Sequence, residues 1–127
     1  KEDIKTRERI ISDFYYEWKR SNPTQRLYNL DLKDYINIRH ISIVETVEHA
    51  ARTYLSTLAV LQLDSILTLA KKVRIVNVKP KDKNQNQFEK MIKMEYELVG
   101  IGKVSLVVGV KRSNKEKVQY CITAIKT

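Results

Sequence analysis

The sequence predicts an α+β fold in which amino-terminal helices pack on one face of a carboxyl-terminal antiparallel sheet of three or four strands. Apolar residues recur every three or four positions before residue 72 and on alternate positions from residue 73 onward, which are the periods of a helix and of a strand. The chain has 127 residues, 43% of them hydrophobic, which suits one domain. We therefore expect a single domain over 1–127, with a helical extension (1–41), a helical layer (42–72) and a sheet (73–127).

Composition excludes several classes of protein. Three glycines and two prolines rule out collagen-like and low-complexity chains, and a single cysteine, Cys121, rules out an intrachain disulfide framework. No apolar run is long enough to span a bilayer. We expect a cytoplasmic protein with no cofactor, no metal ion and no membrane contact. The chain begins at Lys1 rather than at a methionine, so we expect it to be a piece of a longer polypeptide.

Residues 4–20 are predicted to form an amphipathic helix, with Asp3 as its cap and an end at Asn22-Pro23. Its apolar stripe consists of Ile10, Ile11, Phe14, Tyr15 and Trp18. This stripe is either core or a surface on which a partner protein docks through Phe14, Tyr15 and Trp18; a platform for stacking bases is a further alternative.

The next stretch, 24–41, is ambiguous between a short helix and an extended segment. Ser42 then opens a Ser-x-x-Glu capping box that ends at Glu45 and precedes apolar residues at helical spacing up to Ala70. One helix of about 30 residues or two helices would fit. Since helices average about 11–12 residues, we favour two, broken near residues 55–57.

Strand signals occupy the rest of the chain. A first strand around Ile75 to Val78 precedes a loop over 79–87 that is rich in lysine, asparagine and glutamine. Three alternating segments follow, at 92–98, 104–110 and 118–124, with turns at 100–102 and 113–115.

The alternation assigns the two faces of this sheet. The residues expected to face the helices are Ile92, Met94, Tyr96, Leu98, Val104, Leu106, Val108, Val110, Val118, Tyr120 and Ile122. The opposite face would carry Lys93, Glu95, Glu97, Ser105, Val107, Gly109, Lys111, Lys117, Gln119, Cys121 and Thr123. That face is expected to be polar, mixed in charge and free of bulky apolar groups. It is either an ordinary solvated face or a shallow groove for nucleic acid.

Positive charge is concentrated in the sheet region. The net charge of the chain is +9, and residues 71–127 alone hold 14 basic and 5 acidic side chains, which is also +9. A basic surface attracts polyanions through counterion release, so RNA or another nucleic acid is the expected partner. The expected contact residues are Lys79, Lys81, Lys83, Lys93, Arg112, Lys115, Lys117, Gln119 and Thr123.

Residues 67–125 resemble a known family. They read L-T-L-A-K-K-V, then a basic loop, then M-E-Y-E-L-V-G-I-G-K-V-S-L-V-V-G-V-K, and end in V-Q-Y-C-I-T-A-I, with Val118 and Tyr120 in a V-x-Y ending. This pattern resembles the barnase-like ribonuclease superfamily of barnase, RelE-type toxins and colicin-type nucleases. The closest likeness is to versions embedded in polyvalent proteins of phages and conjugative elements. The resemblance implies helices before a four-stranded antiparallel sheet, with RNA on the sheet face away from the helices.

Metal-independent RNA cleavage needs a base for the 2′-hydroxyl proton, an acid for the leaving 5′-oxygen and cations around the phosphate. Glu45 and His49 are four residues apart on one predicted helix, so they form either an acid–base pair or an ordinary exposed contact. Glu95 or Glu97 on the polar face is the other candidate base. Lys111, Arg112 or Lys79 would neutralise the charge on the phosphate. An RNA-directed domain of a mobile element or toxin, with ribonuclease activity as one form, is the first hypothesis; a non-catalytic nucleic-acid-binding module and an immunity or adaptor domain are the alternatives.

Overall fold

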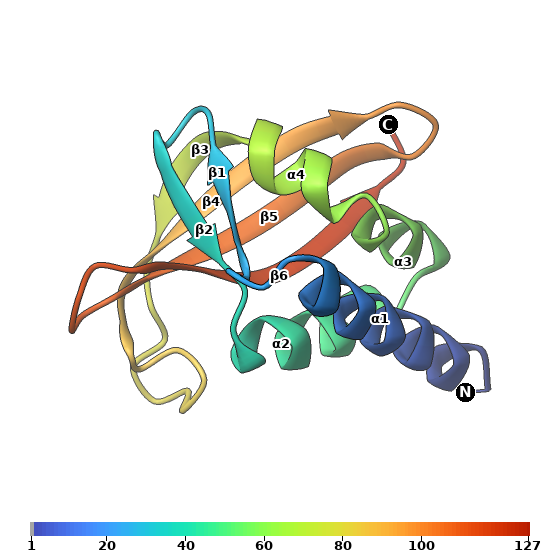
Figure 1. Cartoon of the computed structure of the whole chain (residues 1–127), viewed down its shortest axis with the longest axis horizontal. Helices are drawn as coiled ribbons and strands as arrows, with labels where there is room; N and C mark the ends of the chain where they lie inside the picture. The colour runs from blue at the N-terminus through green and yellow to red at the C-terminus, as the bar shows by residue number, and fades with distance from the viewer. Residues whose placement is uncertain (1) are drawn as a thin grey trace.

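The protein has an α+β architecture, and the computed structural model describes residues 2–127 of it (Figure 1). Lys1 lies outside the described residues. In chain order the elements are α1 (Glu2–Ser21), β1 (Arg26–Asn29), β2 (Asp34–Asn37), α2 (His40–Ala50), α3 (Tyr54–Val60), α4 (Leu63–Leu69), β3 (Lys71–Val76), β4 (Phe88–Leu98), β5 (Gly102–Lys111) and β6 (Lys117–Ile125). None of the helices in the described part of the chain is long and apolar enough to cross a membrane.

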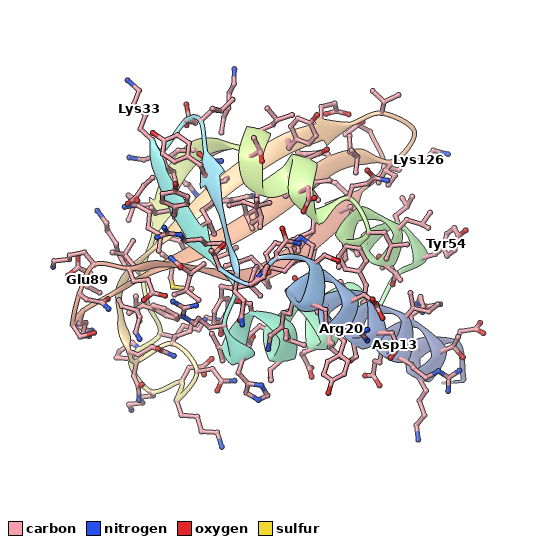
Figure 2. The ribbon with its side chains drawn as sticks, viewed as in Figure 1. Asp13, Arg20, Lys33, Tyr54, Glu89 and Lys126 are labelled. Carbon is pink, nitrogen blue, oxygen red and sulfur yellow. The ribbon has the colours of Figure 1, made fainter. Side chains whose placement is uncertain are left out.

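All six strands form one sheet in the order β1-β2-β6-β5-β4-β3. Strands β3 to β6 pair antiparallel with their neighbours in sequence, which confirms the predicted meander. The expectation of three or four strands is too low, because the ambiguous stretch forms the hairpin β1–β2, whose four-residue strands are too short to show a clear period. Its turn includes Lys33, at φ 56°, which Figure 2 shows at the tip of the hairpin. The hairpin joins β6 through a parallel contact at Asn37 and Val118.

One face of the central strands, here called the core face, is covered by α4 and the hairpin β1–β2 (Figure 1), and α1, which contacts α2 and α3, adds side chains to the same core. Helix α1 contributes Ile11 and Tyr15, which are fully buried, and Trp18, whose indole Nε1 donates to Asp64 Oδ1 over 2.6 Å. Phe14 is half-buried against the same core. The stripe therefore belongs to the core except for Ile10, which is exposed, and docking of a partner through Tyr15 and Trp18 is not available in this structure. Asp3 lies within α1 rather than capping it, because the helix already begins at Glu2.

Helices α2 and α3 run along the edge of β6 that the short contact with β2 leaves unpaired. Ser56 of α3 takes the place of a neighbouring strand there: its hydroxyl accepts from Ala124 N over 2.8 Å and donates to Ala124 O over 3.3 Å. The helical layer comprises three helices, not two, and its first break falls at residues 51–53 rather than 55–57. Thr53 explains this position, because its hydroxyl caps α3 by accepting from Ser56 N.

The predicted capping box at Ser42 is wrong. Helix α2 begins two residues earlier, at His40, and the Ser42 hydroxyl accepts from the backbone N–H of Arg39 over 3.0 Å. Ser42 is thus the third residue of the helix and bonds back to the residue before it. Glu45 therefore has no capping role, and its carboxylate lies on the side of the sheet away from the core.

A bulge in β6 changes which residues face the core. Cys121 pairs with Val107 and Gln119 pairs with Val108, so Tyr120 is an extra residue between them. Before the bulge the alternation is therefore reversed, and Gln119 faces the core, where it is fully buried. The predicted placement of Gln119 on the nucleic-acid face is wrong, as is the predicted placement of Val118 and Tyr120 on the core face.

The face away from the core, here called the open face, is apolar at one end. Phe88, Met91, Val118 and Tyr120 form a small buried cluster on it, to which Val78 of the loop is added. Gly109 leaves room for the Phe88 ring, since a Cβ at this position would lie 2.7 Å from that ring. The expectation of a face without bulky apolar groups therefore fails at this end. The remainder of the open face consists of two rows of register partners across β4, β5 and β6, Lys93–Val107–Cys121 and Glu95–Ser105–Thr123, in which Val107 is apolar and packs against this cluster.

Candidate functional site

A pocket of about 410 Å³ lies on the open face, where α2, the loop after β3 and the central strands meet. We call it the main pocket. It is lined by Glu45 and His49 of α2, Arg74 and Val76 of β3, Asn77, Lys79, Asp82 and Gln85 of the loop, Met91 and Lys93 of β4, Ser105 and Val107 of β5, and Tyr120 and Cys121 of β6. The structure therefore brings Glu45 and His49, the candidate acid–base pair, and two of the predicted lysines, Lys79 and Lys93, to one place.

Glu45 of the main pocket is held by two side-chain contacts. One carboxylate oxygen, Oε2, accepts from Asn84 Nδ2 over 2.7 Å, and the other, Oε1, lies 3.3 Å from His49 Nε2. Asn84 belongs to the loop after β3, so this contact fastens the loop to α2 (Figure 1). The orientation of the carboxylate is thus fixed from two sides.

His49 is the accessible member of the pair. Its side chain is 35% exposed, against 9% for that of Glu45. With Nε2 directed at the carboxylate, Nδ1 is the ring nitrogen left for another partner. A carboxylate in contact with an imidazole orients the ring, so the arrangement suits proton abstraction by His49 with Glu45 as the group that positions it.

Two groups from β6 lie behind this pair. Burial raises the pKa of the Tyr120 phenol, and the nearby Glu45 carboxylate raises it further, so the phenol keeps its proton at neutral pH and is a hydrogen-bond donor. Burial also raises the pKa of the Cys121 thiol to about 12, with a smaller contribution from Glu45. Cys121 is therefore a thiol rather than a nucleophilic thiolate at neutral pH.

Three cationic side chains reach the main pocket from separate elements: Arg74 from β3, Lys79 from the loop and Lys93 from β4. Glu45 and Asp82 are the carboxylates among the lining residues. Arg74 and Lys93 are register partners on adjacent strands, and Lys79 of the loop lines the same pocket. Such an arrangement suits a multiply coordinated anion such as a phosphate.

A smaller pocket of about 220 Å³ adjoins the main pocket and shares Lys93 and Ser105 with it. We call it the side pocket; Glu95, Lys103 and Thr123 also line it. The Glu95 carboxylate lies 3.7 Å from Lys93 Nζ and 3.8 Å from Lys103 Nζ, which holds it between two positive charges. The two pockets, which share Lys93 and Ser105, are here together called the groove.

Several predicted site residues lie elsewhere. Lys81 and Lys83 are exposed in the loop, and Lys111 lies opposite Phe88 near the end of β5. Four others contact groups outside the groove: Glu97 accepts from Thr127 Oγ1, Arg112 donates to Asn86 O, Lys115 pairs with Glu89, and Lys117 pairs with Asp34. Figure 2 places Glu89 toward the end of the sheet where β5 and β6 are joined. The structure does not bring these residues together with Glu45 and His49.

The sequence reasoning missed Arg74, Asn84 and Tyr120. Arg74 follows a bulge in β3, between Lys72 and Arg74, that sets it opposite Lys93. Asn84 reaches Glu45 across 39 positions of sequence, which no local pattern reports. Tyr120 was assigned to the wrong face because of the bulge in β6. Only Arg74 carried a usable signal, as a basic residue inside a strand segment.

Comparison with known proteins adds no assignment. A scan against protein-family models, a search of curated proteins and a search of solved structures each found no match. The function is therefore argued from the geometry of the groove.

Proposed function

We propose that the protein binds RNA in the groove and cleaves it at the main pocket by metal-independent transesterification. The observation that carries the proposal is the meeting of a carboxylate–imidazole pair with Arg74, Lys79 and Lys93 in one pocket. These are the group types that cleavage by the substrate's own 2′-hydroxyl requires. The resemblance to the barnase-like superfamily supports the proposal, because RNA lies on the corresponding sheet face in that family.

In this reaction His49 acts as the base. It takes the proton of the 2′-hydroxyl, the 2′-oxygen bonds to phosphorus, and the bond from phosphorus to the 5′-oxygen breaks. The products are a 2′,3′-cyclic phosphate and a 5′-hydroxyl. Glu45, 3.3 Å from His49, stabilises the imidazolium that forms.

The general acid that protonates the leaving 5′-oxygen is a group other than Glu45 and His49. Attack and departure occur on opposite sides of the phosphorus, whereas Glu45 and His49 are in contact and so approach from one side. The leaving oxygen takes its proton from an ammonium group of the pocket, Lys79 or Lys93, or from water. Arg74 and the remaining lysine offset the charge that builds up on the phosphate.

The test is incubation of the pure protein with RNA in EDTA, with analysis of the new ends. We expect fragments with 2′,3′-cyclic phosphate and 5′-hydroxyl ends. Glu45→Gln should lower the rate by roughly 10²-fold or more, in the range of acid–base catalysis. Glu48→Gln is the matched control, since Glu48 pairs with Arg52 at the same spacing on the exposed side of α2.

Two results decide against this function. Equal rates for Glu45→Gln and Glu48→Gln would show that Glu45 takes no part in any cleavage observed. Salt-sensitive RNA binding without cleavage would leave a binding module, and charge reversal at Lys93 should then still weaken that binding.

A further inference from the structure

Strand β3 forms an open edge of the sheet. Among the strands of residues 2–127 it pairs only with β4, so no strand is hydrogen-bonded to its other edge. Residues 71–75 are exposed, and the side chains of Val73 and Ile75 are exposed by 48% and 45%. An exposed edge with apolar side chains is a template for pairing with another strand.

The start of this edge already accepts a carboxylate. Asp31, in the turn between β1 and β2, accepts from the backbone N–H of Lys72 through Oδ2 over 2.8 Å. Its oxygen stands where an acceptor of an adjacent strand would stand. A hollow of about 190 Å³ lined by Leu30, Asp31, Leu69 and Lys71 lies beside it and offers room for a side chain.

The charge of the edge selects the occupant. Lys71, Lys72 and Arg74 give the six-residue strand three positive charges and no negative one. A second copy of this chain would place like charges opposite one another, which disfavours pairing. An acidic strand would place carboxylates opposite those cations.

We propose that the outer edge of β3 binds an extended acidic segment of a partner protein by strand addition. Backbone hydrogen bonds would extend the sheet, and Val73 and Ile75 would pack against alternate side chains of the added strand. Arg74 and Val76 also line the main pocket, so the added strand lies beside the groove. This binding does not depend on RNA cleavage.

The probe is a synthetic peptide of eight residues with alternating glutamate and valine. At about 1 mM, which half-fills a site with a Kd of about 1 mM, it should slow amide hydrogen exchange at residues 73–76. The same peptide with every second amide N-methylated keeps the charge but loses one bonding edge, and it should give no slowing. A peptide of alternating lysine and valine should give none either.

Charge reversal supplies the matched variants. Lys71→Glu, Lys72→Glu and Arg74→Glu together should abolish the slowing, and Lys72→Glu alone should reduce it in a protein with native circular dichroism. Lys5→Glu, Arg9→Glu and Lys126→Glu change the net charge equally at exposed positions away from β3 and should leave it intact. Absence of slowing in the unaltered protein overturns the proposal. Retention of slowing with the N-methylated peptide also overturns it, because binding would then be electrostatic rather than strand addition.

Discussion

Two polar clusters are built from adjacent residues of α2 and β6. One is fully buried, and the other lines the main pocket. The inner cluster joins Thr46 of α2 and Gln119 of β6 to Tyr15 of α1, and all three are fully buried. The Tyr15 hydroxyl donates to Gln119 Oε1 over 2.6 Å, and Gln119 Nε2 donates to Thr46 Oγ1 over 2.8 Å. These three side chains bond to one another and have no exposed surface, so the inner cluster stabilises the fold and cannot contact a ligand.

The outer cluster uses the neighbouring positions, Glu45 of α2 and Tyr120 of β6, together with His49 and Asn84. It opens into a pocket, and His49 is partly exposed. The single extra residue of the β6 bulge separates the two clusters, because it directs Gln119 inward and Tyr120 outward. A bulge thus lets one helix–strand contact supply both stability and a reactive site, in keeping with the frequent occurrence of bulges beside functional sites.

The largest expected effect comes from breaking the outer cluster. His49→Gln removes the base and should lower RNA cleavage by about 10²- to 10⁴-fold. The free energy of unfolding should change by less than about 0.5 kcal/mol, as for other partly exposed positions. Initial rates of RNA cleavage and urea titration of the same preparation measure the two quantities. A loss of folding free energy large enough to account for the lower cleavage rate would show that His49 has a structural role.

Breaking the inner cluster should do the reverse. Tyr15→Phe leaves Gln119 Oε1 buried without its donor, which costs about 1–3 kcal/mol. Cleavage should be unchanged wherever the variant is folded. Urea titration at constant m-value measures the loss, and Tyr16→Phe is the control, since Tyr16 is 73% exposed. A loss equal to that of the control would contradict the assigned role of the inner cluster.

This contrast explains which parts of the fold were predictable. The long strands β4 and β5 have ten or more residues each, and their alternation alone assigns Lys93, Glu95 and Ser105 to the open face. The bulge in β6 has no residue-type signal, because Gln119, Tyr120 and Cys121 fit either phase of the alternation. Its position depends on the packing of Tyr15 and Thr46 against Gln119, which are distant in sequence.

The candidate site was predictable to the same limited extent. The spacing of Glu45 and His49 predicts their contact, which the structure contains. It does not predict that Asn84 holds Glu45, nor that Arg74 joins the pocket, since both depend on how a loop and an edge strand fold back over the sheet. Net charge pointed to residues 71–127, which hold Arg74, Lys79 and Lys93 of the main pocket. It could not separate Lys79, which lines the pocket, from Lys115, which is paired with Glu89.

A smaller effect is expected on the reactivity of the Cys121 thiol, which lies close to Glu45 of the outer cluster. With a pKa of about 12, roughly one thiol in ten thousand is ionised at pH 8, and the reactive thiolate should increase tenfold with each pH unit. The rate of alkylation by iodoacetamide can be measured by mass spectrometry between about pH 7 and about pH 10. This rate should rise throughout the range without a plateau. Glu45→Gln should speed it by less than about tenfold, because a nearby negative charge is removed. A plateau near pH 9, as in a urea-unfolded control, would contradict the assigned environment of the thiol.

The smallest effect is expected at the ion pair between Lys117 and Asp34, which ties β6 to β2 over 2.7 Å. The hydrogen bond from Lys117 holds the pKa of Asp34 below its usual value. A carboxyl with a lower pKa in the folded state adds stability above its unfolded pKa of about 3.9 and loses it as the pH falls through the folded value. The Asp34 side chain is 48% exposed, so the pair should contribute less than about 1 kcal/mol.

A double-mutant cycle with Asp34→Asn and Lys117→Met should give this coupling energy at about pH 6. Repetition below the folded pKa of Asp34 should reduce the coupling energy toward zero. A coupling that is independent of pH would mean that packing of the lysine stem, rather than its charge, joins the hairpin to the sheet.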